Sequence, residues 1–167
     1  FSAPNARLRG PLTATTGFGN ITLGDVLGPR TITVPVSSTS PTFNFNNVTN
    51  LIIDSAVGIT SVSARSWDDS DTTRDIITAP FLEALTISGG NLDFDLRLTG
   101  RTGNLPTLGP VNINGVIKQA RWIVDGSVTS ISAFATTVNF FANIVGNLGS
   151  ISTVQTLRAK IAAQSIG

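Results

Sequence analysis

A six-residue phrase recurs three times along this chain. It reads ITSVSA from Ile59, VTSISA from Val128 and LGSIST from Leu148. Self-similarity at periods of about 20 residues or more is the signature of solenoids, in which each repeat forms one coil of a stack. The interval between the second and third copies fits one such coil, and the longer interval between the first two fits several. The phrase therefore favours folds that pile equivalent segments along a common axis.

Short segments that alternate apolar and polar residues predict β-strands. The clearest cover 21–23, 31–34, 42–45 and 92–98, and a period of two is typical of a strand with one buried face. Gly, Pro, Asn and Ser interrupt the alternation at intervals of roughly ten residues. The segment 154–163 also fits a helical stripe, but the surrounding repeat favours a strand. The chain is thus predicted to be all-β.

A right-handed parallel β-helix, or β-solenoid, with coils of about 20 residues explains both the repeat and the alternation. Inward positions of successive coils would stack like on like. The phrase supplies apolar residues at its first, fourth and sixth positions, as in Ile59, Val62 and Ala64. The alternative is a β-sandwich, which is disfavoured because Asn114-Gly115 is the only two-residue Asn-Gly turn signal.

The repeat divides the chain into two sections. Residues 43–167 carry it and are expected to form one continuous β-helix region. Residues 1–42 depart from it and contain Pro29, Pro35 and Pro41, so an irregular N-terminal section or a cap is expected there. The final Ile-Gly repeats the opening of the phrase at Leu148. An uncapped strand edge is therefore expected, to be covered by more chain or by another molecule.

Two of these segments resemble a known class of protein. The stretch GITSVSARSW from Gly58 to Trp67 and the phrase at Leu148 are similar to repeats of right-handed parallel β-helix surface proteins of bacteria. They are most similar to repeats of giant planctomycete-type surface proteins, and more loosely to autotransporter passengers. The resemblance covers about residues 43–167. It implies a secreted, cell-surface, adhesive or filament-forming role without a cofactor.

Composition argues against several functions. Only 13% of residues are charged and the net charge is +1, which gives no electrostatic footprint for nucleic acid. The chain has neither His nor Cys, so it has no ordinary Ser-His triad and no disulfide. It also lacks an apolar run long enough for a transmembrane helix. A surface of uncharged polar residues suits a secreted or cell-surface protein.

The densest acidic cluster is a candidate metal site. Asp68, Asp69 and Asp71 follow one another closely and supply the hard oxygen ligands that Ca²⁺ prefers. The alternative is a solvated loop between coils, neutralised by the flanking Arg65 and Arg74. Ca²⁺ is the only cofactor that the sequence suggests.

A second acidic pair is a candidate carbohydrate site. Asp93 and Asp95 lie on the same outward face of a predicted strand, and a pair of carboxylates can run glycoside hydrolysis. Trp67 would add a ring on which a sugar stacks. The clean alternation of this strand favours a simpler interpretation, in which both carboxylates solvate the outer face. Core or corner packing is likewise favoured for Trp67.

These observations predict a structural protein rather than an enzyme. We expect a rigid, self-associating segment of a bacterial cell-surface or extracellular protein, which forms filaments or lattices and depends weakly on salt because few charges take part. One alternative is a carbohydrate-binding or carbohydrate-cleaving β-helix with a polysaccharide or cell-surface ligand. Another is an adhesin or an ice-binding face, for which Thr13-Ala-Thr15 and Thr31-Ile-Thr33 are the candidates.

Overall fold

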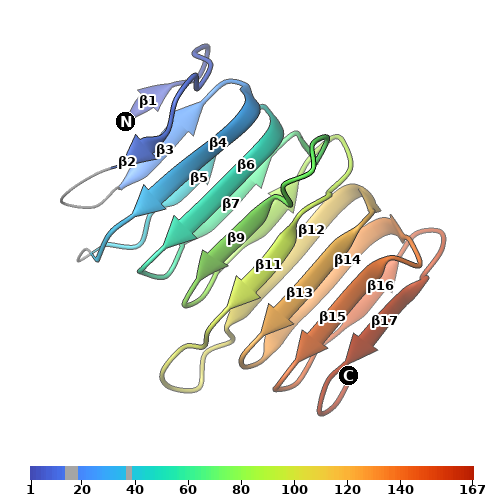
Figure 1. Cartoon of the computed structure of the whole chain (residues 1–167). Coiled ribbons are helices and arrows are strands. Elements are labelled where there is room, and N and C mark those ends of the chain that lie inside the picture. Colours follow the sequence, from blue (N-terminus) through green and yellow to red (C-terminus); the bar gives the residue numbers. More distant parts are fainter. Residues whose placement is uncertain (14–18, 37–38) are drawn as a thin grey trace.

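The computed structural model describes residues 1–13, 19–36 and 39–167. These residues form an all-β solenoid of about eight coils, and every strand pair among them is parallel (Figure 1). The chain runs one way along the near sheet and the opposite way along the far sheet while it advances from the N-terminal to the C-terminal coil (Figure 1). This winding is right-handed, the hand that nearly all parallel crossovers adopt. The predicted fold class is therefore confirmed.

Two sheets run the length of the stack, and β8 (Ser66–Asp68) pairs beside β6. The first sheet contains, in spatial order, β1 (Ser2–Ala3), β3 (Asn20–Leu23), β5 (Thr42–Asn44), β7 (Ser61–Ala64), β10 (Leu85–Ile87), β12 (Leu108–Ile117), β14 (Val128–Thr136) and β16 (Ile151–Thr153). The second contains β2 (Leu12–Thr13), β4 (Val26–Val34), β6 (Asn47–Ser55), β9 (Ile76–Ala79), β11 (Asp95–Leu98), β13 (Ala120–Val124), β15 (Phe140–Ile144) and β17 (Ala159–Ala162).

Equivalent residues of the recurrent phrase stack in register, as predicted. Val62 pairs with Leu85, Leu85 with Val111, Val111 with Ile131, and Ile131 with Ile151. The coil from Leu85 to Val111 is longer than the two that follow it, so the coil length varies while the ladder continues. All but the last of these side chains are fully buried. Each contributes roughly 1.5–3 kcal/mol relative to an exposed position.

A second ladder runs along the corner that leads into the first sheet. It begins at Ile59, the first residue of the first phrase, and continues through Leu82, Leu108, Val128, Leu148 and Ile166. Every member except Ile166 is buried. The apolar residues recur along the chain because the side chains of each coil must cover those of the next.

The described part of residues 1–42, for which an irregular section or a cap was expected, continues the two sheets. Strands β1 to β4 belong to the same two sheets, and Ile21 and Ile32 lie in the core. The prolines fall where no ladder hydrogen bond is needed. Pro35 follows the end of β4, Pro41 precedes β5, and Pro29 sits at a register shift of β4. Proline has no backbone N–H to donate to a sheet ladder. It is therefore tolerated at bulges and strand ends, where that hydrogen bond is not needed.

The segment 154–163 contains β17 and no helix, so the strand interpretation is confirmed. Within the described ranges, no helix is long and apolar enough to cross a membrane.

Candidate functional site

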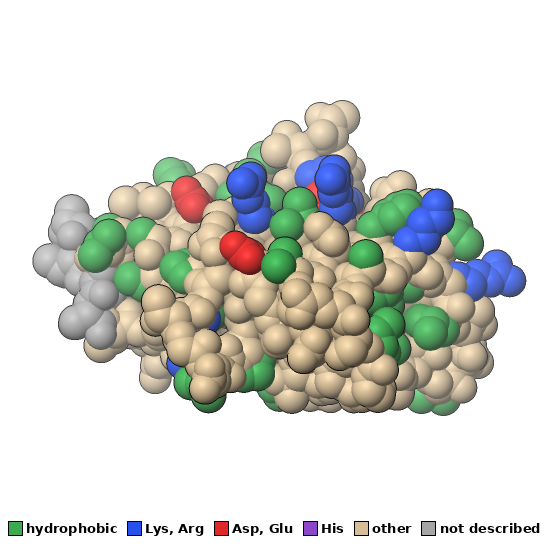
Figure 2. All heavy atoms as spheres, turned by 90° about the horizontal axis from the view of Figure 1, so that it is seen from below, with side chains coloured by type: hydrophobic (Ala, Val, Ile, Leu, Met, Phe, Trp, Pro, Cys, Tyr) green, Lys and Arg blue, Asp and Glu red, His purple; other side chains and the backbone are tan. Residues whose placement is uncertain are grey.

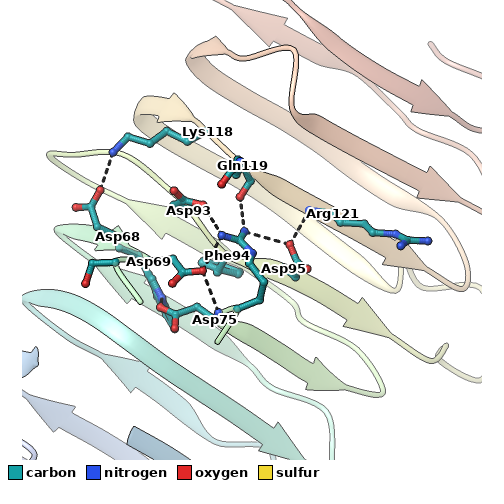
Figure 3. Close-up of polar contacts among 12 residues, drawn as sticks. Asp68, Asp69, Asp75, Asp93, Phe94, Asp95, Lys118, Gln119 and Arg121 are labelled. Carbon is teal, nitrogen blue, oxygen red and sulfur yellow. Dashed lines mark hydrogen bonds and ion pairs between the residues drawn. The ribbon is translucent and has the colours of Figure 1, made fainter. Parts of the chain in front are cut away.

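The largest group of interacting charges lies at the corner between β8 and β9. We call it the Arg74 cluster, and it consists of Asp69, Arg74, Asp75, Asp93 and Asp95 (Figure 3). The loop from 69 to 75 brings the first three residues over the start of β11, where Asp95 is the first residue of the strand and Asp93 precedes it. The coil that leads from Ile53 on β6 to its partner Ile77 on β9 is longer than the next one, from Ile77 to Leu96. Its extra length supplies the loop.

Arg74 links three successive coils. Its Nη1 lies 2.7 Å from Asp69 Oδ2 and 2.9 Å from Asp93 Oδ1, and its Nη2 lies 3.2 Å from Asp95 Oδ1. The same Nη2 donates to the backbone carbonyl of Gln119, one coil further on. A planar guanidinium can make these bonds at once because its donors point outward in a fixed fork. The cluster therefore ties neighbouring coils together at their outer corner.

Burial makes the cluster electrostatically costly to disturb. The side chains of Asp69 and Asp93 are only 3% and 13% exposed. Burial raises the pKa of Asp93, and hydrogen bonding and attraction to Arg74 oppose the rise. Burial acts to lower the pKa of Arg74, but the hydrogen bonds that it donates to Asp93 and Asp95 and their negative charges raise it overall. One guanidinium thus compensates several carboxylates in a partly desolvated corner.

Asp75 is buried beside an indole. It is 1% exposed, and its Oδ2 accepts a hydrogen bond of 2.7 Å from Trp67 Nε1. Burial raises the pKa of Asp75 to about 7, while hydrogen bonds from the Leu51 backbone and Trp67 hold it down. Trp67 itself is fully buried, with its ring centroid 4.5 Å from that of Phe94. The indole has no face for a sugar, so the stacking role considered for Trp67 is excluded by its place in the core.

The carboxylates considered for Ca²⁺ do not converge. Asp68 Oδ1 lies 2.8 Å from Lys118 Nζ, whereas Asp69 faces Arg74. Asp71 accepts a hydrogen bond from the backbone N–H of Thr73 in its own loop. No set of three His, Cys, Asp or Glu side chains that could hold a metal occurs among the described residues. In the described structure the carboxylates of Asp68, Asp69 and Asp71 thus face three different partners, two of them cations, and do not gather around one point.

Asp93 and Asp95 share an outward face, as the alternation predicts, but they do not simply solvate it. Both are held by Arg74, and Asp95 Oδ1 also accepts a hydrogen bond from the backbone N–H of Arg121. Each carboxylate therefore has an oxygen committed to Arg74, whereas a general acid or base must reach the proton that it transfers. The geometry of the pair is that of a structural ion network.

Among the described residues the Thr pairs align on two strands only, where Thr13 of β2 pairs with Thr33 of β4. Thr13-Ala-Thr15 lies mostly outside the described residues. On β6 the partners of Thr31 and Thr33 are Ile52 and Asp54. An ice-binding surface would need Thr repeated on neighbouring strands, and these partners interrupt it.

A second polar surface lies on the outer face of the second sheet and was missed by the sequence reasoning. We call it the cationic strip, and it consists of Arg97, Arg121, Phe141 and Lys160 on β11, β13, β15 and β17. All four side chains are exposed. The absence of Asp and Glu after Asp125 was a signal for Lys160 alone among the three cations, and only the fold brings these residues together on one face.

Comparisons with protein-family models, with curated proteins and with solved structures find no match to this chain. The function must therefore be argued from the geometry of the solenoid and its surfaces.

Proposed function

We propose that the chain is a structural, self-associating segment of a bacterial cell-surface or extracellular protein, a rigid rod whose coils stack end to end with those of another copy. One observation carries this proposal. The ladder that runs through Ile32, Ile77 and Leu96 begins at Leu12 and finishes at Ile161, and both of these terminal side chains are only partly covered. Each end of the stack thus presents an apolar residue in a position that is buried elsewhere.

The backbone at both ends offers the matching hydrogen-bonding groups. Among the described strands β17 pairs only with β15, and β2 pairs only with β4. The outer edge of each terminal strand therefore carries unpaired N–H and C=O groups, which are a template for another strand. A second copy placed with its β2 against β17 would set Leu12 beside Ile161 and continue the core ladder in parallel register. The like-on-like stacking that stabilises the single chain supports this arrangement.

Charge opposes this contact weakly. No Asp or Glu precedes Asp25 or follows Asp125. End-to-end stacking would bring Arg7 and Arg9 near Arg158 and Lys160, all of them exposed. Exposed charge pairs contribute at most about 1 kcal/mol and are screened by salt. Added salt should accordingly strengthen association modestly, which refines the weak dependence expected from composition.

A matched pair of substitutions on β17 tests the proposal. Ile161 points inward and Ala162 points outward on the same strand. Ile161→Lys places a charge in the proposed contact, and inward charges are a natural protection of sheet edges. We expect sedimentation velocity and electron microscopy at rising protein concentration to show end-to-end oligomers for the parent chain and for Ala162→Lys, and monomers for Ile161→Lys.

The fold of each variant is checked by far-ultraviolet circular dichroism. A parent chain that stays monomeric at the highest concentration would refute the proposal. So would an Ile161→Lys variant that remains folded and assembles like the parent.

The state of Asp93 and Asp95 supports a structural protein over a carbohydrate-cleaving enzyme, because Arg74 occupies both carboxylates. Low overall charge and a Ser-, Thr- and Asn-rich sequence support the extracellular setting. Turnover of a polysaccharide that is lost in Asp93→Ala, while the variant stays folded, would overturn this part of the proposal.

A further inference from the structure

We infer that the cationic strip binds an acidic polysaccharide. The inference does not rest on self-association, although Lys160 also lies at the proposed end contact, and it concerns the outer face of β11, β13, β15 and β17. Figure 2 shows Lys and Arg side chains projecting along one edge of the molecule, among few acidic ones. Four features of this face lead to the ligand: its unpaired cations, its exposed aromatic ring, its groove and its spacing.

The cations of the strip have no acidic partner in the described structure. Arg97, Arg121 and Lys160 make no salt bridge there, in contrast to Arg74, Arg101 and Lys118. Asp95 accepts a hydrogen bond from the backbone N–H of Arg121, but the Arg121 guanidinium is directed away from Asp95 (Figure 3). These charges therefore remain available to an anionic ligand.

An exposed aromatic ring lies between two of the cations. Arg121 pairs in register with Phe141, and Phe141 pairs with Lys160 on the next strand. The Phe141 ring is 41% exposed although large apolar side chains are usually covered, and Lys160 Nζ lies 5.3 Å from its centroid. A ring flanked by cations offers an apolar platform for a sugar face and charge-assisted hydrogen bonds for its acidic group.

The strip also borders a groove. A depression of about 640 Å³ is lined by Arg121, Ile123, Phe141, Asn143 and Lys160, among others. Its size falls in the range of small-molecule sites, and its lining combines apolar and polar side chains as such sites do. Asn143 adds an exposed amide with both donor and acceptor atoms for sugar hydroxyls.

The spacing favours an extended polymer that lies along the solenoid axis. Neighbouring strands are about 4.8 Å apart, so Arg121 and Lys160, which lie two strands apart, are separated by roughly 10 Å along the axis. Arg97 lies on the same face of β11 but is level with Ile123, so it stands beside this row rather than in it. A nucleic acid is disfavoured because it carries a much denser charge and the chain has a net charge of only +1. A carboxylated polysaccharide has both sparse charges and apolar ring faces.

Affinity electrophoresis and isothermal titration calorimetry with polygalacturonate test the inference. Neutral dextran and a single-stranded oligothymidine serve as comparison ligands. We expect polygalacturonate to bind with an affinity that falls as salt rises, and neither comparison ligand to bind as tightly. Arg121→Gln/Lys160→Gln should lower the affinity about tenfold or more, because two charge-assisted hydrogen bonds are removed. Phe141→Ala should also weaken binding without any change in charge.

The matched control is Arg9→Gln/Arg65→Gln, which removes the same charge from two exposed arginines outside the strip. It should bind polygalacturonate like the parent chain. Equal loss of binding in the two double variants would indicate attraction by net charge and would overturn the inference. Absence of binding by the parent, or tighter binding of the oligothymidine, would overturn it as well. Circular dichroism confirms that each variant is folded.

Discussion

The coils from about residue 47 to 125 and those from 126 onward are built on the same ladders but are held in different ways. Several of the earlier coils are longer, as between Leu85 and Val111, and one of them carries the loop of the Arg74 cluster. The later ones are short, as between Ile131 and Ile151. Nine of the ten acidic residues lie in the earlier coils, and none lies in the later ones. Where the coil is longer, ion pairs fix the extra chain, and where it is short, apolar stacking alone suffices.

This difference indicates where each part of the molecule is vulnerable. In a solenoid each coil contacts only its neighbours, so stability is roughly a sum of local terms. A defect in the earlier coils has neighbours on both sides, whereas a defect in the last coils can be released by fraying of the end. The same substitution should therefore have different consequences in the two regions.

The largest effect on stability is expected from truncating two residues of one ladder, each in a separate variant. Leu82→Ala and Leu148→Ala each remove a fully buried side chain from the same corner ladder, which costs about 3–4 kcal/mol. We expect Leu82→Ala to lower the global free energy of unfolding by this amount. Leu148→Ala should mainly speed hydrogen exchange from about residue 148 onward. Equal global destabilisation by both variants would contradict this local picture of the stack.

Removal of the cluster's cation should cost nearly as much. Arg74→Ala leaves the buried Asp69 and Asp93 without their partner, and the loss of one member of a buried ion pair costs about 3 kcal/mol. The control is Lys118→Ala, since the Lys118–Asp68 pair also joins different coils but is about half exposed. It should change stability by no more than about 0.5 kcal/mol in urea denaturation. Similar losses of unfolding free energy in the two variants would show that the burial of Asp69 and Asp93 does not make the cluster depend more strongly on Arg74.

Much of the fold, and little of this cluster, could be predicted from the sequence. The phrase at Ile59 and Val128 identified residues that stack in one ladder. This was possible because the alternation of buried and exposed side chains in a strand can be recognised within a few residues. Arg74 reaches Asp93 and Gln119, which lie far along the chain, only because coils of unequal length align. Nothing in the local pattern encodes that alignment. Asp93 and Asp95 were correctly placed outward, but the loop that covers them could not be foreseen.

A smaller effect should appear in the pH dependence of the earlier coils. The pKa of Asp75 is raised from 3.8 to about 7 in the folded chain, so the folded state holds a proton that the unfolded state releases. This contribution is complete below pH 3.8 and is lost as pH rises toward 7. Asp75→Asn keeps an oxygen for Trp67 Nε1 and cannot ionise. We expect it to be about 2 kcal/mol more stable than the parent at pH 8 and similar at pH 4.

Equilibrium urea unfolding monitored by tryptophan fluorescence measures this change, since Trp67 contacts the titrating group directly. The last coils contain no acidic residue, so hydrogen exchange there should not follow the same pH profile. A parent chain whose stability rises between pH 4 and pH 8 would contradict the assignment of a protonated Asp75.

The smallest effect concerns how the earlier coils turn their corner. Asn50 has a φ of 61°, in the left-handed region, and its amide bonds both the hydroxyl and the backbone N–H of Ser70 in the next coil. Gly28, with a φ of 81°, stands at the equivalent break in β4. After Gly126 no described residue has a positive φ.

Asn50→Ala should lower the free energy of unfolding by about 1–2 kcal/mol, because it loses the bonds to Ser70 and strains the backbone. Asn50→Gly should cost less, since only the bonds are lost. Both variants lose the bonds to Ser70, so the opposite ranking in thermal unfolding would show that the left-handed backbone conformation is not what favours Asn at this corner.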